Sequence, residues 1–336
     1  KNLIHSDTAF YWYIKSHNLG ENIQAGRFLL NKTMTVSEIA EKLSNSQASE
    51  SILTIQEGLL IRDIDQKLVE LTLIEEGELL QAVKEFKDWQ FYDFLDAKTL
   101  STLALPLEGY LYPDTYFLDS NNFEAQDLIF LALDNFERKT KELLPQIKKH
   151  SIHEIITMAS IIETEVFGEK DRKQVSGILW KRNDNGWMIG ADATLLYITD
   201  DRKINYADLA IDSPYNTRKF AGLPPGPIAN PSVESIEAAM FPTANPYWFY
   251  LTTLDTGKVI YSKTNDEHNS NRAKYLGKTL TSHFFEELML GATKKFQWLN
   301  GKLFSKKNST MSEPSSTQEM LFLKVKQNPP QQKHSI

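Results

Sequence analysis

The feature that most constrains how this chain folds is an apolar segment, residues 152–166, that ends with two carboxylates. With about 100° of rotation per residue, an α-helix gathers regularly spaced apolar side chains into one stripe. The stripe consists of Ile155, Met158, Ala159, Ile162 and Val166, and Ile156 and Ile161 widen it. We therefore expect a helix whose stripe is buried against a hydrophobic core.

The two glutamates of this helix, Glu163 and Glu165, fall roughly 80° to either side of the centre of the stripe, on opposite borders. A carboxyl on such a border is partly removed from water, which raises its pKa and keeps it protonated near neutral pH. A general acid needs that property. The same pattern also fits two solvated glutamates at a helix end, and periodicity does not choose between Glu163 and Glu165.

Composition and motifs argue against several classes of function. The 336 residues carry a net charge of -7 with no cluster of Lys and Arg, which argues against nucleic-acid binding. The seven histidines are scattered, and neither a serine-hydrolase elbow nor a phosphate-binding loop occurs, so we expect no metal and no cofactor. The absence of cysteine is compatible with an oxidising compartment.

The order of the predicted elements indicates an α+β chain with a small N-terminal unit. Residues 1–50 are expected to hold an aromatic helix at 9–14, a strand at 25–30 and a helix that begins at a capping box of Thr35 and Glu38. A polar run at 44–51 marks a boundary. The elements predicted after it are a strand at 52–55, helices to about 100, helices at 123–149, 152–167, 169–184 and 232–240, a hairpin of 247–252 with 259–262, and a helix opening at His268. The polar segment after about 290 is expected to be a tail that is disordered over 305–336.

Three loops combine aromatic and polar residues with Pro or Gly: 106–116, 190–197, and 213–217 with its continuation at 222–231. Such loops fit plain turn chemistry, but aromatic rings also stack on the apolar faces of sugars. Leu and Ile are threaded through the 222–231 run, which we interpret as a rigid wall rather than a hinge. Carboxylates beside aromatic, hydroxyl and amide groups suit a polysaccharide substrate.

Cleavage of a polysaccharide can require one carboxyl or two. Retaining and inverting hydrolases use a pair of carboxyls at a defined separation. A lytic transglycosylase needs one, which protonates the glycosidic oxygen and then deprotonates the 6-hydroxyl of the sugar, so that an anhydro ring closes without water. A single embedded glutamate fits the second scheme, but Asp192 or Glu163 as a second carboxylate keeps a hydrolase open.

Several motifs, in order along the chain, give this sequence a resemblance to the MltG (YceG-like) endolytic murein transglycosylases of bacteria. The resemblance runs from about Ala25 to Leu276. Its motifs are AGRF (25–28) with MTV (34–36), EG (57–58), EGYLYPDTY (108–116), MASIIETE (158–165), DAT (192–194) with Tyr197, YNT (215–217), GLPPGPI (222–228) and EHN (267–269). Each motif is weak by itself, and it is their common order that is specific.

The resemblance implies roles for particular residues. The family's catalytic glutamate is the second one in its S-I-[IV]-E-x-E pattern, which falls on Glu165. Glu163 becomes a supporting or substrate-contacting carboxylate. The residues implied to line the cleft and bind N-acetyl and hydroxyl groups are Asp192, Thr194, Tyr215, Asn216 and Asn269.

The chain departs from the family's Gln-[ST]-Asp-Pro-Thr pattern, because it reads GADAT at 190–194. The amide side chain and the proline are missing, which puts a substrate contact and some rigidity of that loop in doubt. The catalytic glutamate is present. A hydrolytic muramidase and a non-catalytic murein-binding scaffold are the alternative interpretations.

The resemblance also implies a domain organisation and a setting. Residues 1–51 would be part of a LysM-like subdomain, 52–290 a mixed α+β catalytic domain, and 291–336 a polar tail. The family is anchored by one N-terminal transmembrane helix. No run here reaches the roughly 18 apolar residues that span a bilayer, but the sequence begins at Lys1 rather than Met, so an anchor can precede it. The expected setting is the outer face of the cytoplasmic (inner) membrane. The expected substrate is nascent peptidoglycan glycan strands, which are cut to leave 1,6-anhydro-N-acetylmuramic ends. Cell-wall synthases are the expected protein partners.

Overall fold

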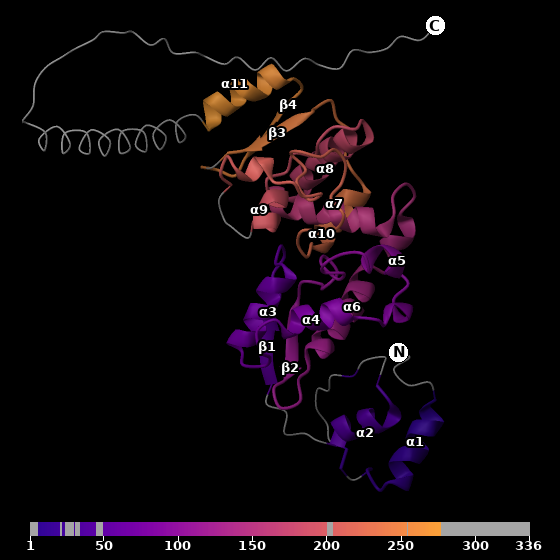
Figure 1. Ribbon diagram of the computed structural model, residues 1–336. Helices are drawn as coiled ribbons and strands as arrows, with labels where there is room; N and C mark the ends of the chain where they lie inside the picture. The colour runs from indigo at the N-terminus through magenta and orange to yellow at the C-terminus, as the bar shows by residue number, and fades with distance from the viewer. Residues whose placement is uncertain are drawn as a thin grey trace, which may run out of the picture. The chain divides into compact units, whose positions relative to one another are not determined.

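The structure is a computed structural model that describes residues 6–20, 22–23, 30, 34–44, 50–199, 204–253 and 255–276 (Figure 1). The chain divides into two units, residues 1–276 and residues 277–336, and every described residue belongs to the first. The tail expected over 291–336 and most of the strand expected at 25–30 lie outside the described residues. The predicted domain boundaries at 51 and 290 stay predictions.

Two helices are described in the N-terminal part of the first unit. Helix α1 (Asp7–Ser16) contains the predicted aromatic helix. Helix α2 (Val36–Ser44) follows the predicted capping box, in which the Thr35 hydroxyl accepts from the Glu38 N–H at 3.3 Å and the Glu38 carboxylate accepts from the Thr35 N–H at 2.7 Å. The LysM-like character of residues 1–51 stays a prediction.

The next part combines a two-stranded sheet with helices. Strand β1 (Glu50–Thr54) pairs antiparallel with β2 (Thr115–Asp119), and Leu53 lies opposite Tyr116. The elements between the two strands are α3 (Ile61–Glu70), α4 (Glu78–Glu85), the 3-10 turn η1 (Trp89–Phe91) and α5 (Ala97–Leu100). The loop predicted at 106–116 therefore ends in a strand, because its last two residues begin β2.

Helix α6 (Ala125–Thr140) is shorter than the helix predicted at 123–149. The chain leaves the helix before Pro145, which lies in the 3-10 turn η2 (Leu144–Gln146), because a proline inside a helix removes a hydrogen bond and clashes with the preceding turn. Helices α7 (Ile152–Glu165) and α8 (Glu169–Asp184) begin where the sequence predicts them.

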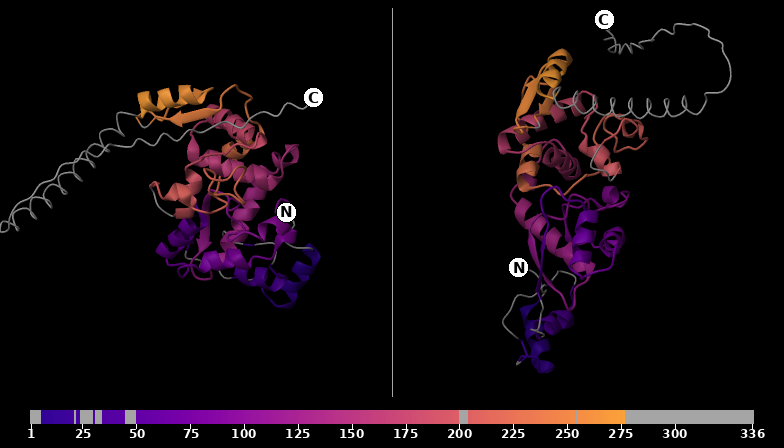
Figure 2. Two further views of the ribbon diagram at one scale, coloured as in Figure 1. Left: turned by 45° about the horizontal axis from the view of Figure 1, so that its top comes forward. Right: turned by 90° about the vertical axis from the view of Figure 1, so that its left-hand side faces the viewer.

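The C-terminal described elements end in a hairpin covered by a helix. In order they are α9 (Ala193–Thr199), the 3-10 turn η3 (Asp208–Ala210), α10 (Val233–Met240), β3 (Phe249–Thr252), β4 (Val259–Ser262) and α11 (Asn265–Tyr275). Strands β3 and β4 form the predicted hairpin, and α11 packs on it (Figures 1 and 2). The prediction that this helix opens at His268 is wrong, because the Thr264 hydroxyl caps its N-terminus by accepting from the Glu267 N–H at 3.2 Å.

Helix α7 is the central element of the core. All nine residues from Ile155 to Glu163 are buried, so the helix is covered around most of its circumference rather than along one stripe. Helix α10 packs along it and α8 contacts both (Figure 1). Within the described part of the chain, no helix is both long enough and apolar enough to cross a membrane.

The Pro/Gly-rich run at 222–231 is held by hydrogen bonds from two directions. The Asn230 side-chain oxygen accepts from the backbone N–H of Leu111 at 3.0 Å. The N–H of Ile228 donates to the Ser160 hydroxyl, on α7, at 3.0 Å. The run is thus a fixed wall that connects the central helix to the loop before β2, as interpreted from its sequence.

Candidate active site

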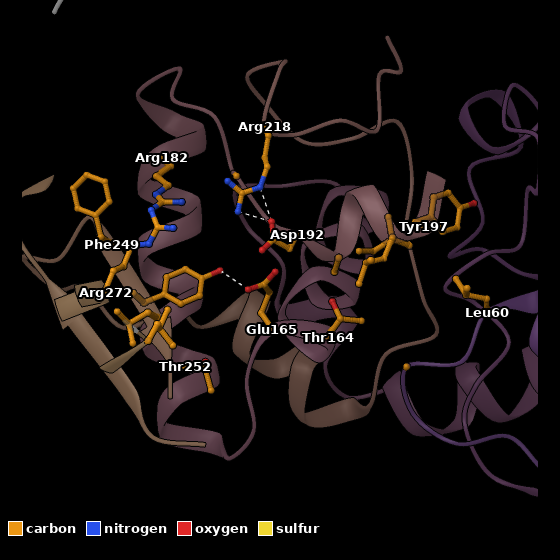
Figure 3. Close-up of a pocket in the computed structure, with 18 of the residues that line it drawn as sticks. Leu60, Thr164, Glu165, Arg182, Asp192, Tyr197, Arg218, Phe249, Thr252 and Arg272 are labelled. Atoms are coloured by element: carbon orange, nitrogen blue, oxygen red, sulfur yellow. Dashed lines mark hydrogen bonds and ion pairs between the residues drawn. The ribbon is translucent and has the colours of Figure 1, made fainter. Parts of the chain in front are cut away.

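The C-terminal end of α7 opens into a pocket of about 910 Å³ (Figure 3). Its size falls within the range of sites that hold organic ligands. In Figure 3, Glu165 lies in the middle, Phe249 and Arg272 lie on one side of it, and Leu60 and Tyr197 lie on the other. The pocket is therefore built from segments that are far apart in the sequence and meet around one carboxyl.

Glu165 is the last residue of α7, and its side chain is half-buried in this pocket. The hydroxyl of Tyr250, on β3, donates to Glu165 Oε2 at 3.1 Å (Figure 3). The chain becomes extended immediately afterwards, at Val166. A rigid helix and a strand thus fix the position of the carboxyl while leaving part of it accessible.

The pKa of Glu165 is raised above its ordinary value, chiefly because burial removes the carboxyl from water and also because Asp192 places a negative charge nearby. Hydrogen bonds from Tyr250 and from the backbone N–H of Ala193, together with the charge of Arg218, act in the opposite direction without cancelling the rise. The C-terminal end of a helix also disfavours a negative charge. A larger fraction of this carboxyl is protonated near neutral pH than of an exposed glutamate, which suits a proton donor.

Asp192 forms the wall of the pocket facing Glu165, and its carboxylate is already engaged. Arg218 Nε donates to Asp192 Oδ1 at 2.5 Å, and a second guanidinium nitrogen contacts the same oxygen. Both side chains stay largely accessible, with 58% of Asp192 and 39% of Arg218 exposed. Asp192 therefore contributes a paired charge to the pocket that a ligand can still reach.

Arg182, on α8, holds the strand that carries Tyr250. Its Nε and Nη2 donate to the carbonyl oxygen of Trp248 at 2.9 and 2.7 Å, and its Nη1 donates to the carbonyl oxygen of Ile189 at 2.6 Å. Its guanidinium also lies 5.9 Å from the centre of the Tyr250 ring. One partly buried cation thereby fixes the start of β3 against the loop that leads to Asp192.

Glu163 lies outside the lining of the pocket, although it is only two residues from Glu165. Its Oε1 accepts from Arg172 Nη2 at 2.7 Å, and its Oε2 accepts from both the backbone N–H and the hydroxyl of Ser232, at 2.8 and 2.5 Å. Only 5% of its side chain is exposed. Both oxygens are engaged within the protein, so Glu163 anchors the start of α10 in this structure and does not face a ligand.

Thr194 and Asn216, expected to contact substrate, are fully buried and hold loops together. The Thr194 hydroxyl donates to the carbonyl oxygen of Ala191 at 2.8 Å and shares a hydrogen bond with Thr217. The Asn216 amide donates to the carbonyl oxygen of Ile211 at 2.9 Å. Their polar groups are directed at the backbone, so neither faces the pocket.

The departure at 190–194 leaves this loop well bonded. The N–H of Gly190 donates to the carbonyl oxygen of Thr217 at 3.0 Å, and the N–H of Ala191 donates to the Thr217 hydroxyl at 3.2 Å. Gly190 has a φ of +71°, a conformation that a residue with a Cβ rarely adopts. The two hydrogen bonds to Thr217 hold this loop in place without the proline.

The two remaining candidates lie beside the pocket rather than in its lining. The Tyr215 ring packs against the Tyr197 ring at a tilt of 36° with ring centres 4.9 Å apart, and Tyr197 is the ring that lines the pocket. Asn269 is exposed on α11. The structure thus brings Glu165 and Asp192 together, and it places the other five predicted residues around them.

Sequence reasoning missed the residues that complete the pocket, namely Tyr250, Arg182, Arg218, His268 and Arg272. Strand alternation does not single out Tyr250, because four consecutive residues of β3, Phe249 to Thr252, line the pocket. No local pattern points to the arginines, whose roles depend on tertiary contacts. Among the described residues, no group of three or more His, Cys, Asp or Glu is arranged to hold a metal ion.

Comparison with known proteins gives the relatives of this chain. The model of the YceG-like family matches residues 1–274. A protein of Bacillus subtilis strain 168 named endolytic murein transglycosylase is 33% identical over 289 residues, which cover 82% of this chain and 79% of that protein. A protein of the same name from Streptococcus pneumoniae D39 is 27% identical over 314 residues, 83% of this chain but only 55% of the streptococcal protein.

A solved structure agrees with these matches. The crystal structure of a yceG-like protein from Listeria monocytogenes superposes with a TM-score of 0.61 at 32% identity, over 80% of this chain and 91% of the Listeria chain. The family match spans nearly all of the described residues, from the N-terminal helices to α11. Sequence and fold therefore agree, and this chain belongs to the YceG-like family.

Proposed function

We propose that this chain is an endolytic murein transglycosylase, a lyase that cuts peptidoglycan glycan strands internally without using water. The observation that carries the proposal is that one carboxyl in the pocket is available for proton transfer. Of the three carboxyls in the lining, Asp192 is paired with Arg218, and Asp63 accepts from the backbone N–H of Leu60 at 2.9 Å at the start of α3. Glu165 remains, with a raised pKa. The names of the relatives from Bacillus and Streptococcus support the same activity.

The proposed first step is proton donation by Glu165. The carboxyl protonates the oxygen of the β-1,4 bond between N-acetylmuramic acid and N-acetylglucosamine, and the bond from that oxygen to C1 of the muramic sugar breaks. The N-acetylglucosamine side leaves with a free 4-hydroxyl, and C1 develops oxocarbenium character. Glu165 is now a carboxylate, which Tyr250 stabilises by donating its hydrogen bond at 3.1 Å.

In the second step the same carboxylate acts as the base. It removes the proton from the 6-hydroxyl of the muramic sugar while O6 bonds to C1, which closes the 1,6-anhydro ring. The proton returns to Glu165, so the residue is ready for another cycle and no water is consumed. One carboxyl with a raised pKa suits both directions of transfer, because its two protonation states are closer in free energy near neutral pH than those of an ordinary glutamate.

A hydrolytic muramidase is the competing candidate, since Asp192 lies close enough to raise the pKa of Glu165. An inverting or retaining hydrolase needs its second carboxylate free to activate water or attack C1. The ion pair with Arg218 occupies an oxygen of Asp192, which favours the transglycosylase. An Asp192→Asn variant separates the two mechanisms, because only the hydrolase depends on that carboxylate as a reacting group.

The test is product analysis by mass spectrometry after digestion of purified glycan strands. A transglycosylase gives muramic ends lighter by one water than the reducing ends that a muramidase gives. We expect anhydro ends from the wild type, and a loss of about 10²- to 10⁴-fold in rate for Glu165→Gln with the fold unchanged. Reducing ends would refute the transglycosylase. Full activity of Glu165→Gln would refute the choice of carboxyl.

We also propose the setting that the family resemblance implies. The protein would act at the outer face of the cytoplasmic membrane, held by the N-terminal anchor of its family, with residues 1–51 as part of a LysM-like subdomain and with cell-wall synthases as partners. Support for the setting comes from the resemblance alone. Two measurements test it. Cell fractionation should find the native protein in the membrane fraction, and protease added outside the membrane should digest its catalytic domain.

A further inference from the structure

The pocket carries more positive charge than the rest of the chain leads one to expect. The chain has a net charge of -7. Four arginines line the pocket against three carboxyls, namely Arg62, Arg182, Arg218 and Arg272 against Asp63, Glu165 and Asp192. When Glu165 is protonated, as its proposed role requires, only two of those carboxyls are charged. The pocket that is ready for reaction therefore has an excess of positive charge inside an acidic protein, which favours an anionic ligand.

Three of these arginines, all except Arg62, differ in what their guanidinium groups already bind. Arg182 donates to two backbone carbonyl oxygens, and Arg218 is paired with Asp192. Arg272, on α11, is exposed, and its guanidinium makes no hydrogen bond or ion pair with another described residue. Among these three arginines, and counting partners within the described residues, Arg272 is the one whose donors are left for a ligand.

The neighbours of Arg272 do not neutralise it. His268 is stacked on Phe249 with ring centres 5.2 Å apart. Burial and the charges of Arg272 and Arg182 lower the pKa of His268, so both guanidinium groups lie within electrostatic reach of the same neutral ring. Figure 3 shows Arg272 and Arg182 on the same side of Glu165. Two cations that face one cavity are stabilised by an anion that binds in it.

The chemistry of a guanidinium indicates the kind of anion. Its planar donors match the two oxygens of a carboxylate. On a murein glycan the sugar ring, hydroxyl and N-acetyl groups are neutral, and the negative charge is carried by carboxylates of the substituent at O3 of the muramic sugar. We propose that Arg272 binds a carboxylate of that substituent, either the lactyl group itself or the peptide attached to it, and so selects anionic strands. The inference rests on the proposed function and adds a determinant of specificity to it.

The test is a binding measurement in the Glu165→Gln background, so that no ligand is turned over. Four oligosaccharides of equal length are compared: glycan with free lactyl carboxylates, its methyl ester, glycan with peptide substituents, and the methyl ester of that. The two acid–ester pairs separate the lactyl group from the peptide as the source of the carboxylate. Affinities are measured by calorimetry at two salt concentrations, because an ionic contact at an exposed site weakens as salt screens it.

We expect at least one acid to bind about five- to twentyfold more tightly than its ester, and Arg272→Gln to abolish that difference while leaving the affinity for the ester unchanged. Arg272→Lys should restore part of the preference. Lys274→Gln is the matched control, because it removes the same charge from an exposed position two residues along α11 that does not line the pocket.

Two results would overturn the inference while leaving the proposed function intact. One is equal affinity of acid and ester for the parent protein, and the other is equal loss of both in Arg272→Gln. If none of the four oligosaccharides binds and the wild type cleaves no glycan, the proposed function itself fails. The salt dependence is an independent measurement. The preference of the parent protein for the acid should shrink as the salt concentration rises, whereas Arg272→Gln should bind acid and ester equally at both salt concentrations.

Discussion

Glu108, a buried glutamic acid outside the lining of the pocket, allows a sharp test of the electrostatics of this fold. Only 2% of the residue is exposed. Its Oε1 accepts from the backbone N–H of Ile61 at 3.1 Å, and its Oε2 has no hydrogen-bond partner within the described residues. Burial raises its pKa to about 8, although the Ile61 hydrogen bond and the charge of Arg62 act to lower it. The side chain is therefore neutral in the folded protein at pH 7.

The sign and size of the effect on stability follow from linkage. In the unfolded chain Glu108 ionises at its ordinary value of 4.5, whereas in the folded protein it holds its proton until about pH 8. Its contribution to stability is complete below pH 4.5 and is lost as pH rises, at about 1.4 kcal/mol per unit. Over the interval up to pH 8 the loss amounts to about 5 kcal/mol, a large part of the free energy of unfolding of a typical domain.

Replacing Glu108 with glutamine removes the titration and keeps the shape. The amide oxygen still accepts from Ile61, but the amide N–H groups meet no partner where Oε2 has none, which costs about 1–2 kcal/mol. We expect Glu108→Gln to be less stable than the wild type at pH 5 and more stable at pH 8, by about 3 kcal/mol.

The assay is denaturant unfolding of both proteins at pH values from 5 to 8.5, with the difference in free energy of unfolding plotted against pH. All other groups titrate in both proteins, so the difference isolates position 108. Glu57→Gln is the control, because it removes an exposed carboxylate, and it should leave the pH dependence of the free energy of unfolding unchanged. Parallel curves for the wild type and Glu108→Gln would refute the assignment of a neutral buried acid.

Three further predictions concern Tyr250, Gly109 and Glu163. Tyr250→Phe removes the donor to ionised Glu165, so the pKa of Glu165 should rise further and the alkaline limb of the rate profile should move to higher pH; an unmoved limb would exclude Glu165 as the titrating acid. Gly109→Ala should lower the free energy of unfolding in urea by about 2–5 kcal/mol, because φ is +86° and the new Cβ would lie 2.4 Å from Pro227. Gly58→Ala is the control, since φ is +81° there but the Cβ would meet open space, and it should lower the free energy of unfolding by about 1 kcal/mol. Glu163→Gln leaves Arg172 unpaired and should cost about 3 kcal/mol of stability while the folded fraction keeps its turnover; a loss of turnover per folded molecule would give Glu163 a part in the reaction.

Local patterns in the sequence predicted the elements that depend on local interactions. The helix at 152–165, the helix at 169–184 and the hairpin were found from periodicity, and the capping box of Thr35 and Glu38 was found from spacing. The start of α11 was missed although the same signal was present, since Thr264 and Glu267 also have the spacing of a capping box. The pairing of β1 with β2 could not be predicted, because more than sixty residues separate them and no local pattern sets the partner.

Of the residues that line the pocket, the sequence predicted Glu165 and Asp192 as site residues. Periodicity placed Glu165 on a partly buried border, and the family resemblance selected it over Glu163. The polar residues of the nearby loops, such as Thr194 and Asn216, share the composition of ligand-binding residues, yet their hydrogen bonds serve the loops. Arg182 and Arg272 carry no distinctive local pattern, so their places in the pocket follow from how α8 and α11 pack on the hairpin.

Three glutamates of this protein show why residue type and spacing cannot assign their roles. Glu163 has an arginine and a helix N-terminus as partners and is held as a structural anchor. Glu108 is buried with one partnered oxygen, so neutrality is its most stable state. Glu165 is half-buried, with a tyrosine donor on one side and a pocket on the other, so both of its protonation states are supported and a ligand can reach it. Proton transfer requires that combination, and it arises only when α7, β3 and the loop at 190–194 meet.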